Sequence, residues 1–344
     1  ALRPLDVVPI GDDDGQVRFA LQDTSGIAPQ ALLLSLPGYY IAAHLDGAHT
    51  LDQLRAGFAQ QFGQELPVEQ AFRLIDALDK ALLLDNDRFR AAHAAHVAAY
   101  RAAPVRDNRQ RWPDGDTLRA EITAMLADGA AAPDADVAGL IAPHLDYARG
   151  APCYASAYAA LDEAPAAERY VILGTNHAGL GRGVVATGKD FLTPLGRVPT
   201  DRAFLAELDD RLGGRLCDHE ADHLREHSVE LQVHVLQVVQ PDHPFEIVPL
   251  LCPDVCGDTG TAPADGHGVD VADFAAALAD LLRASPRRTV VIAGADLSHV
   301  GQRFGEPAPT TPEFLERVAW QDRHLLSLLE ARRGGQNHAT ITGS

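Results

Sequence analysis

The sequence contains no cluster of basic residues, and its charge is strongly negative. It has 29 Lys and Arg against 48 Asp and Glu, which gives a formal net charge of −19. Phosphate backbones and anionic lipid surfaces attract clustered Lys and Arg side chains, which this chain does not offer. The composition therefore argues against nucleic acid and against an anionic membrane as partners.

The chain also lacks a long hydrophobic run. No segment approaches the roughly 20 apolar residues that a membrane span requires. Residues 1–6 lack the basic and then apolar layout of a signal peptide. With 46% hydrophobic and 22% charged residues, the composition is that of an ordinary globular protein. We therefore expect a cytoplasmic protein.

Cysteine is scarce, and the Gly-x-Ser-x-Gly phrase of many hydrolases is missing. The four cysteines form no Cys-x-x-Cys pair, and only Cys252 and Cys256 are close enough to hint at a metal site; small buried thiols are the alternative. No Gly-x-Ser-x-Gly phrase occurs. Residues 219–223 do read His-Glu-x-x-His, but a hydrolase with histidine-bound zinc is only a minor alternative here. We also find no internal repeat.

The length of 344 residues predicts two domains, with residues 1–105 forming the first and residues 106–344 the second. Residues 1–105 favour a small winged-helix-like domain followed by a helical linker. Thr50 and Gln53 form a capping box at a helix start, and Pro67 begins the next helix. Residues 81–84 are expected to be a strand.

We expect the first domain to have a core of its own, made by the aromatic and aliphatic residues Phe58, Phe72, Ile75 and Leu78. The would-be recognition helix carries acidic side chains, which suit a peptide or protein contact better than DNA.

Three apolar strands in the second domain each end on a histidine. They cover residues 139–144, 170–177 and 289–299, and their terminal histidines are His144, His177 and His299. From residue 137 onward strands alternate with helices, which predicts a mostly parallel sheet flanked by helices. The carboxyl ends of parallel strands meet at one edge, where ligands bind, and imidazole is the commonest metal ligand. The three histidines are therefore predicted to share one pocket.

Four phrases in the second domain carry a family resemblance. They are Ala142-Pro143-His144, Gly174-Thr175-Asn176-His177, Glu226-His227-Ser228-Val229-Glu230, and the segment from Asp296 to Phe304. In this order and spacing the chain resembles the Memo-like proteins, also called system protein B of the AmmeMemoRadiSam set. The resemblance implies an α/β fold of the class III extradiol dioxygenase type. Residues 46–54 resemble, less specifically, the PqqD-type peptide-binding domains.

The resemblance implies a role for each of the four histidines in these phrases. His144 and His177 match metal-binding positions, and His227 matches a histidine that contacts substrate or oxygen. His299 matches an acid/base histidine beside the metal, and it is the alternative third metal ligand. Five further polar residues are expected to bind substrate: Asp146, Asn176, Glu230, His234 and Asp296.

The remaining metal ligand of both families, a Glu or a Cys, comes late in the chain. Residues 334–340 align with neither form. Three explanations are open: the chain is a shortened one, or His338, Asp146 or Glu230 replaces this ligand, or metal binding is weak. Glu230 and His234 share a helix face, where a surface ion pair is favoured over a new ligand.

The resemblance favours a metal-dependent oxidoreductase, similar to the non-haem iron extradiol dioxygenases, that acts on a phenolic small molecule or a peptide. Fe(II) is the expected cofactor, with copper or zinc as alternatives, because two imidazoles and one further ligand leave positions open for substrate and O₂. The alternative function is a Memo-like metal-binding or partner-binding protein without dioxygenase activity. The first domain is expected to contact a peptide or protein partner.

Overall fold

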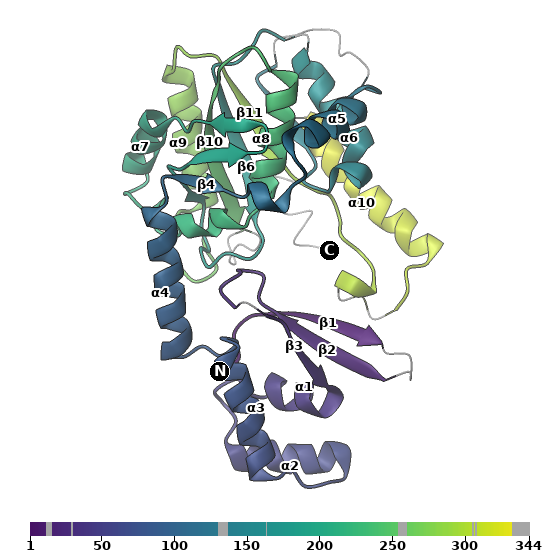
Figure 1. The fold of residues 1–344 in the computed structure, drawn as a ribbon. Helices are drawn as coiled ribbons and strands as arrows, with labels where there is room; N and C mark the ends of the chain where they lie inside the picture. Colours follow the sequence, from purple (N-terminus) through teal and green to yellow (C-terminus); the bar gives the residue numbers. More distant parts are fainter. Residues whose placement is uncertain are drawn as a thin grey trace. The chain divides into compact units, whose positions relative to one another are not determined.

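The computed structural model describes residues 1–11, 16–28, 30–129, 137–162, 164–253, 260–304, 306 and 308–331. The chain forms two compact units, Ala1–Ala103 and Pro104–Ser344, which we call unit 1 and unit 2. Figure 1 shows the elements of each unit. Among the described helices, none has both the length and the apolar character needed to cross a membrane.

Unit 2 is built on a five-stranded sheet. In spatial order its strands are β5 (Gly139–Ala142), β11 (Thr289–Gly294), β6 (Arg169–Asn176), β10 (Glu246–Pro253) and β7 (Val185–Ala186). The first four strands are parallel and β7 is antiparallel to β10. The predicted α/β class with a mostly parallel sheet is confirmed, and the three predicted His-tipped strands are immediate neighbours.

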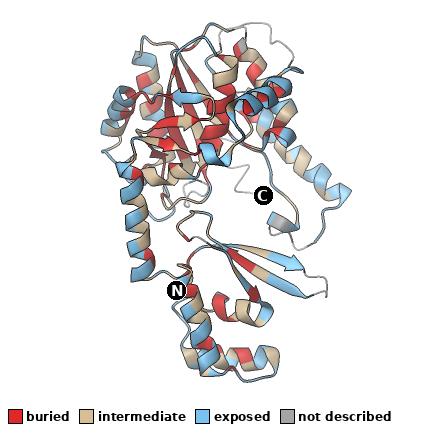
Figure 2. Ribbon diagram, in the orientation of Figure 1, coloured by how far each residue is buried: buried red, intermediate tan, exposed pale blue. Residues whose placement is uncertain are grey.

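Helices cover both faces of this sheet, so its strands are apolar on both sides. One face packs against α5 (Gly115–Leu126), α6 (Tyr147–Asp162) and α8 (Ser228–Val239). The other face packs against α7 (Arg202–Arg211) and α9 (Val271–Ala284). Successive residues of β6 alternate between the two cores, with Tyr170 and Ile172 on the first and Val171 on the second. Figure 2 shows the buried residues gathered in the sheet and the facing sides of its helices.

A second, three-stranded sheet in unit 2 was not expected from the sequence. It consists of β4 (Val105–Asp107), β8 (Asp190–Thr193) and β9 (Gly196–Val198), with β4 parallel to β8. Strands this short give little periodic signal. The unit also contains α10 (Pro312–Glu330) and the short 3₁₀ helices Arg109–Arg111, Glu220–Leu224 and Gln302–Phe304.

Unit 1 begins with an antiparallel sheet of β1 (Asp6–Gly11), β2 (Val17–Gln22) and β3 (Leu32–Ser35). Four helices follow: α1 (Leu36–Ala43), α2 (Leu51–Phe62), α3 (Val68–Lys80) and α4 (Asp87–Ala102). The predicted capping box at the start of α2 is present, since Thr50 and Gln53 exchange side-chain-to-backbone hydrogen bonds. The winged-helix comparison stays a prediction.

Two expectations for unit 1 were wrong. Residues 81–84 are a turn with a single bridge between Leu84 and Leu2, because the Leu83 N–H bonds back to Leu78 O and Leu82 has a φ of 60°. Phe72 is 56% exposed, whereas Phe58 and Leu78 are buried. The helical spacing of α3 is real, but Phe72 falls on its outer side.

Candidate metal and acid–base site

The adjacent strands β5, β11 and β6 bring polar residues to the same edge of the sheet. His144 follows β5 by two residues, Asp296 follows β11 by two, and His177 follows β6 directly. His227 joins them from the N-cap of α8, whose first turn packs against β6. Residues from four separate segments therefore meet here.

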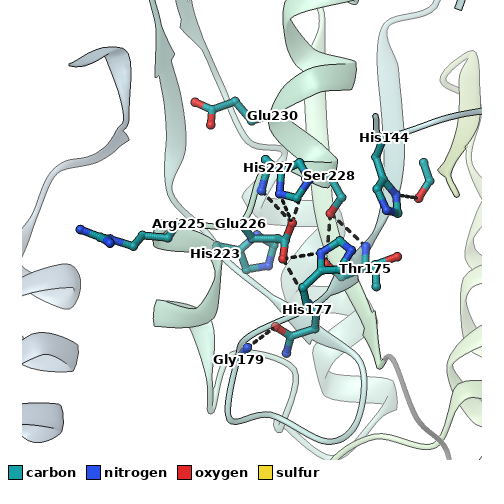
Figure 3. Close-up of polar contacts among 12 residues, drawn as sticks. His144, Thr175, His177, Gly179, His223, Arg225, Glu226, His227, Ser228 and Glu230 are labelled. Atoms are coloured by element: carbon teal, nitrogen blue, oxygen red, sulfur yellow. Dashed lines mark hydrogen bonds and ion pairs between the residues drawn. The ribbon is translucent and has the colours of Figure 1, made fainter. Parts of the chain in front are cut away.

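Three imidazoles lie together in this site. The ring centres of His144 and His177 are 4.9 Å apart, those of His177 and His227 are 5.2 Å apart, and those of His144 and His227 are 5.9 Å apart. Figure 3 shows these side chains around the start of α8. The sequence predicted the first pair as metal ligands, and the structure places His227 beside both, closer to His177 than to His144.

Glu226 lies between two of the imidazoles and organises them. Its Oε2 accepts hydrogen bonds from the backbone N–H and Nδ1 of His177, both at 3.1 Å. Its Oε1 accepts the backbone N–H groups of His227 at 2.7 Å and Ser228 at 2.9 Å, and lies 3.2 Å from His227 Nδ1. Burial raises the pKa of this carboxyl, but the bonds from His177 and His227 outweigh burial and hold the pKa far below its usual value. Glu226 is therefore ionised although it is buried.

His144 is held in a defined orientation. Its Nδ1 lies 2.9 Å from Gly294 O, a carbonyl that can only accept, so Nδ1 carries a proton, and its Nε2 lies 3.5 Å from Asp296 Oδ2. Burial lowers the pKa of His144, against the opposing effects of Gly294 O and Asp296. A neutral imidazole with a free Nε2 is the form that binds a metal ion.

His299 reaches the site through Asp296. Its Nε2 is 3.2 Å from Asp296 Oδ2, and the same oxygen is 3.5 Å from His144 Nε2. The His299 side chain is 44% exposed and its ring contacts Phe304, with ring centres 5.0 Å apart. His299 is thus near His144 and accessible to solvent, as an acid/base group would be.

Two of the predicted substrate-binding residues are engaged in local structure. The Asn176 amide donates to Asp222 Oδ2 at 2.9 Å and to Gly181 O at 3.2 Å, which fixes the loop after β6. Asp146 is exposed and accepts from Arg149 in the first turn of α6. Neither contact brings the side chain to the imidazoles, and a substrate role for these two stays a prediction.

Glu230 and His234 do not form the surface ion pair expected from the sequence, because both side chains are fully buried. Glu230 pairs with the buried guanidinium of Arg106, through contacts of 3.0 Å between Nη1 and Oε1 and 3.1 Å between Nη2 and Oε2. Burial raises the pKa of Glu230, but the charge and hydrogen bond of Arg106, together with smaller effects of His234 and Trp112, lower the pKa overall. His234 packs edge-on against Trp112, and burial lowers its pKa to about 4. The surroundings of both are interior ones, and a substrate role for them stays a prediction.

Arg106 and Glu226 are the functional-site residues that sequence reasoning missed. Arg106 donates to His223 O at 2.5 Å and to Glu226 O at 2.6 Å, so it clamps the backbone just before His227. Nothing near Arg106 in the sequence marks this role. Glu226 is the first residue of the phrase Glu226-His227-Ser228-Val229-Glu230. Its carboxylate directly precedes the candidate histidine His227, and this neighbourhood was the signal that could have identified it.

The donor set fits a divalent ion. Among the described residues, His177, Glu226 and His227 form a group whose ligand-type atoms all lie within 4.8 Å of one another. Imidazoles with their other nitrogen bonded to a carboxylate or carbonyl are the usual arrangement around protein-bound metals. His338 and Cys256, two other residues considered as ligands, lie outside the described residues.

Comparison with known proteins supports the resemblance. A MEMO1 family protein of Aquifex aeolicus is 25% identical over 340 residues, which cover 95% of this chain and 81% of that protein. One from Thermus thermophilus is 28% identical over 294 residues, covering 85% and 83% of the two chains. Both alignments are long enough to extend into unit 1.

An archaeal relative matches a shorter segment more closely. The MEMO1 family protein of Methanopyrus kandleri is 36% identical over 162 residues, 47% of this chain, and the match spans about half (53%) of that protein's length. The profile of the family described as Memo-like protein matches residues 113–342, which include every site residue predicted from the sequence. The chain therefore belongs to the Memo-like protein family.

Proposed function

We propose that unit 2 is a metal-dependent oxidoreductase of the extradiol type, acting on a phenolic small molecule or a phenolic group of a peptide. The observation that carries this proposal is the pair His144 and His177, with ring centres 4.9 Å apart, beside the acid/base pair His299 and Asp296. Fe(II) held by His144 and His177 would supply open coordination positions and electron transfer to O₂.

The chain's own residues have distinct tasks in this proposal. His144 and His177 would hold the ion, and their orientation is set by the contacts of His144 Nδ1 with Gly294 O and of His177 Nδ1 with Glu226. His299 takes the second phenolic proton at its imidazole, and Asp296 holds it toward the site. In the overall reaction a ring carbon–carbon bond breaks and both atoms of O₂ enter the product, so no further reductant is required.

The test measures O₂ uptake with catechol by protein loaded anaerobically with Fe(II). The His299→Ala variant is expected to keep the ion and to lose at least about 10²-fold in turnover, the usual contribution of one acid/base group. The matched control is His243→Ala. His243 is exposed and precedes β10, so it lies at the amino end of that strand, away from the site at the carboxyl ends. Wild-type turnover by His299→Ala would contradict this role. If loaded wild-type protein binds the ion but consumes no O₂ with any phenol tested, the binding-protein function replaces the enzymatic one.

We further propose that unit 1 contacts a peptide partner and that the protein acts in the cytoplasm. A cavity of about 620 Å³ lies against β2, β3 and the start of α1, and the exposed side chains Val17, Leu33 and Leu36 line it. A Leu33→Asp change is expected to raise KM for a catechol-containing peptide at least tenfold and to leave KM for free catechol unchanged. Equal KM values for the peptide in both proteins would contradict the proposal. Cys153 is a free thiol, in keeping with a reducing compartment.

A further inference from the structure

We propose that Gln232, in α8, is the residue that positions His144 at the site, and that Tyr158 fixes the orientation of the Gln232 amide for this task. Gln232 is a positioning residue, because its amide acts on the backbone that carries His144. The inference rests on the proposed function, since it explains how one proposed ligand of the ion is held. Neither Gln232 nor Tyr158 was assigned a role from the sequence.

The amide of Gln232 is bonded to the residue directly before His144. The Gln232 side chain is fully buried, and its Nε2 donates to Pro143 O at 2.9 Å. Tyr154 holds the residue on the other side, because its buried hydroxyl donates to Leu145 O at 3.1 Å. The peptide groups on both sides of His144 are therefore fixed by side chains from the protein interior.

Only one orientation of the Gln232 amide fits its neighbours. Pro143 O is a carbonyl oxygen and can only accept, so the NH₂ group of the amide must face it. Gln232 Oε1 then faces the Tyr158 hydroxyl, which donates to it at 2.8 Å. Burial raises the pKa of Tyr158 well above its usual value, so the hydroxyl keeps its proton and remains a donor. Tyr158 therefore sets the direction in which the amide donates to Pro143.

Gln232 also lies against the strand that orients the His144 ring. The Nδ1 of His144 lies 2.9 Å from Gly294 O, at the end of β11. A Cβ atom at Gly294 would come within 3.2 Å of both Gln232 Nε2 and Ser228 O, closer than such contacts normally are. Glycine at this position therefore lets the Gln232 side chain approach the end of β11. The same side chain thus lies next to both residues that hold His144, Pro143 and Gly294.

A second residue of α8 holds the strand that ends before His177. Ser228 precedes Gln232 by four residues, so both side chains lie on one face of the helix. The Ser228 hydroxyl donates to Thr175 O at 3.1 Å and accepts from the Thr175 N–H at 3.0 Å (Figure 3). The strands β5 and β6 are not neighbours, because β11 lies between them. One turn of α8 therefore links the strand ends that carry His144 and His177, and Gln232 is its link to β5.

The experiment compares Gln232→Met with Gln240→Met. Methionine is close to glutamine in length and is also unbranched, but it cannot donate to Pro143 O. Gln240 is buried at the C-cap of the same helix, about 12 Å further along its axis, and its amide donates to Leu161 O. Both variants lose an amide from the same helix, but only Gln232→Met loses it beside His144.

Two readouts are measured on the metal-free full chain. Anaerobic titration with Co(II), followed by visible absorption, should show an affinity about 10- to 100-fold lower in Gln232→Met, the usual effect of removing an orienting partner. Gln240→Met should stay within about threefold of wild type. The nitrogen NMR spectrum of the histidine side chains reports the His144 tautomer without metal. We expect the proton to stay on Nδ1 in wild type and in Gln240→Met, and to exchange between both nitrogens in Gln232→Met.

Tyr158→Phe tests the second part of the proposal with a smaller change. Without the hydroxyl, the Gln232 amide can turn away from Pro143, so Co(II) affinity should fall about 3- to 10-fold, as expected for the loss of one hydrogen bond. Wild-type affinity in Tyr158→Phe would overturn the role given to Tyr158.

The outcomes separate this inference from the proposed function. Wild-type affinity and an unchanged His144 spectrum in Gln232→Met would overturn the inference and leave the proposed function intact. An equal loss of affinity in Gln240→Met would also overturn it, because the effect would then be one of general stability. Absence of Co(II) binding by wild-type protein would reject the proposed metal site, and the His144 spectrum would then decide the inference alone.

Discussion

The backbone N–H of His144 donates a 2.8 Å hydrogen bond to Asp296 Oδ1, although the two residues are 152 positions apart in the chain. The bond forms because β5 and β11 are parallel neighbours and each residue follows its strand by two positions. It fixes the Asp296 carboxylate so that its other oxygen faces His299. One side chain therefore connects a proposed metal ligand with the proposed acid/base group.

Replacing Asp296 by Asn should separate metal binding from turnover. The amide oxygen still accepts the His144 N–H, but its NH₂ group does not accept from His299 Nε2. We expect Fe(II) affinity within about tenfold of wild type, and catechol-dependent O₂ uptake lower by about 10²-fold or more. Asp242→Asn, an exposed change in the loop before β10, is the control. Loss of the ion in Asp296→Asn would show that Asp296 is itself a ligand.

The buried pair of Arg106 and Glu230 should be essential to the stability of unit 2. Glu230→Gln leaves a buried guanidinium without its counter-ion, which costs about 3–5 kcal/mol. Arg283→Gln breaks an exposed pair with Asp280 and should cost less than about 1 kcal/mol. Urea unfolding followed by tryptophan fluorescence measures both. Similar costs for the two variants would contradict the assignment of Arg106 and Glu230 to a buried pair.

Two buried histidines make stability depend on pH in a defined window. Burial lowers the pKa of His223 to about 3 and that of His234 to about 4. Between about pH 6.5 and pH 4 the unfolded chain binds protons that the folded chain does not, so stability falls as pH falls, by about 1.4 kcal/mol per pH unit for each histidine.

Unfolding free energies measured between pH 6.5 and pH 4.5 check this prediction. His234→Gln should reduce the slope by about one histidine's share, whereas His243→Gln, at an exposed position, should leave it unchanged. An unaltered slope in His234→Gln would mean that His234 is protonated in the folded protein.

In unit 1, Phe58 and Phe72 should differ sharply in their contribution to stability. Phe58 is buried in the core beside Leu54 and Ile41, and Phe58→Ala should cost about 3–5 kcal/mol. Phe72 is 56% exposed, so Phe72→Ala should change stability by no more than about 0.5 kcal/mol. Thermal unfolding of both variants tests this, and a large loss in Phe72→Ala would show that its ring is covered in solution.

The sequence predicted the part of the site that depends on local pattern. Apolar runs ending on His144 and His177, alternating with helices, were sufficient to predict parallel strands that share an edge. The sequence did not reveal Arg106, because its partner Glu230 is 124 positions away and short strand β4 has no periodic signal. Helical spacing predicted that both Phe72 and Ile75 of α3 face the core. In the structure Ile75 is half-buried but Phe72 is exposed, so the spacing identified the inner side of this helix only in part.

The burial of α8 could not be predicted from the sequence either. Its first nine residues are all buried, Glu230 and His234 among them. A charged pair four residues apart usually lies on a surface, and only the tertiary position of Arg106 shows that this pair lies in the core.

The central claim is that this site holds one divalent ion through His144 and His177. The most direct measurement is anaerobic Fe(II) binding to the metal-free full-length protein at micromolar concentration, compared with His144→Ala and His177→Ala. The account predicts one ion per chain for wild type and none for either variant, with the exposed change His243→Ala binding like wild type. No ion bound by wild type, or undiminished binding by both variants, would contradict the claim.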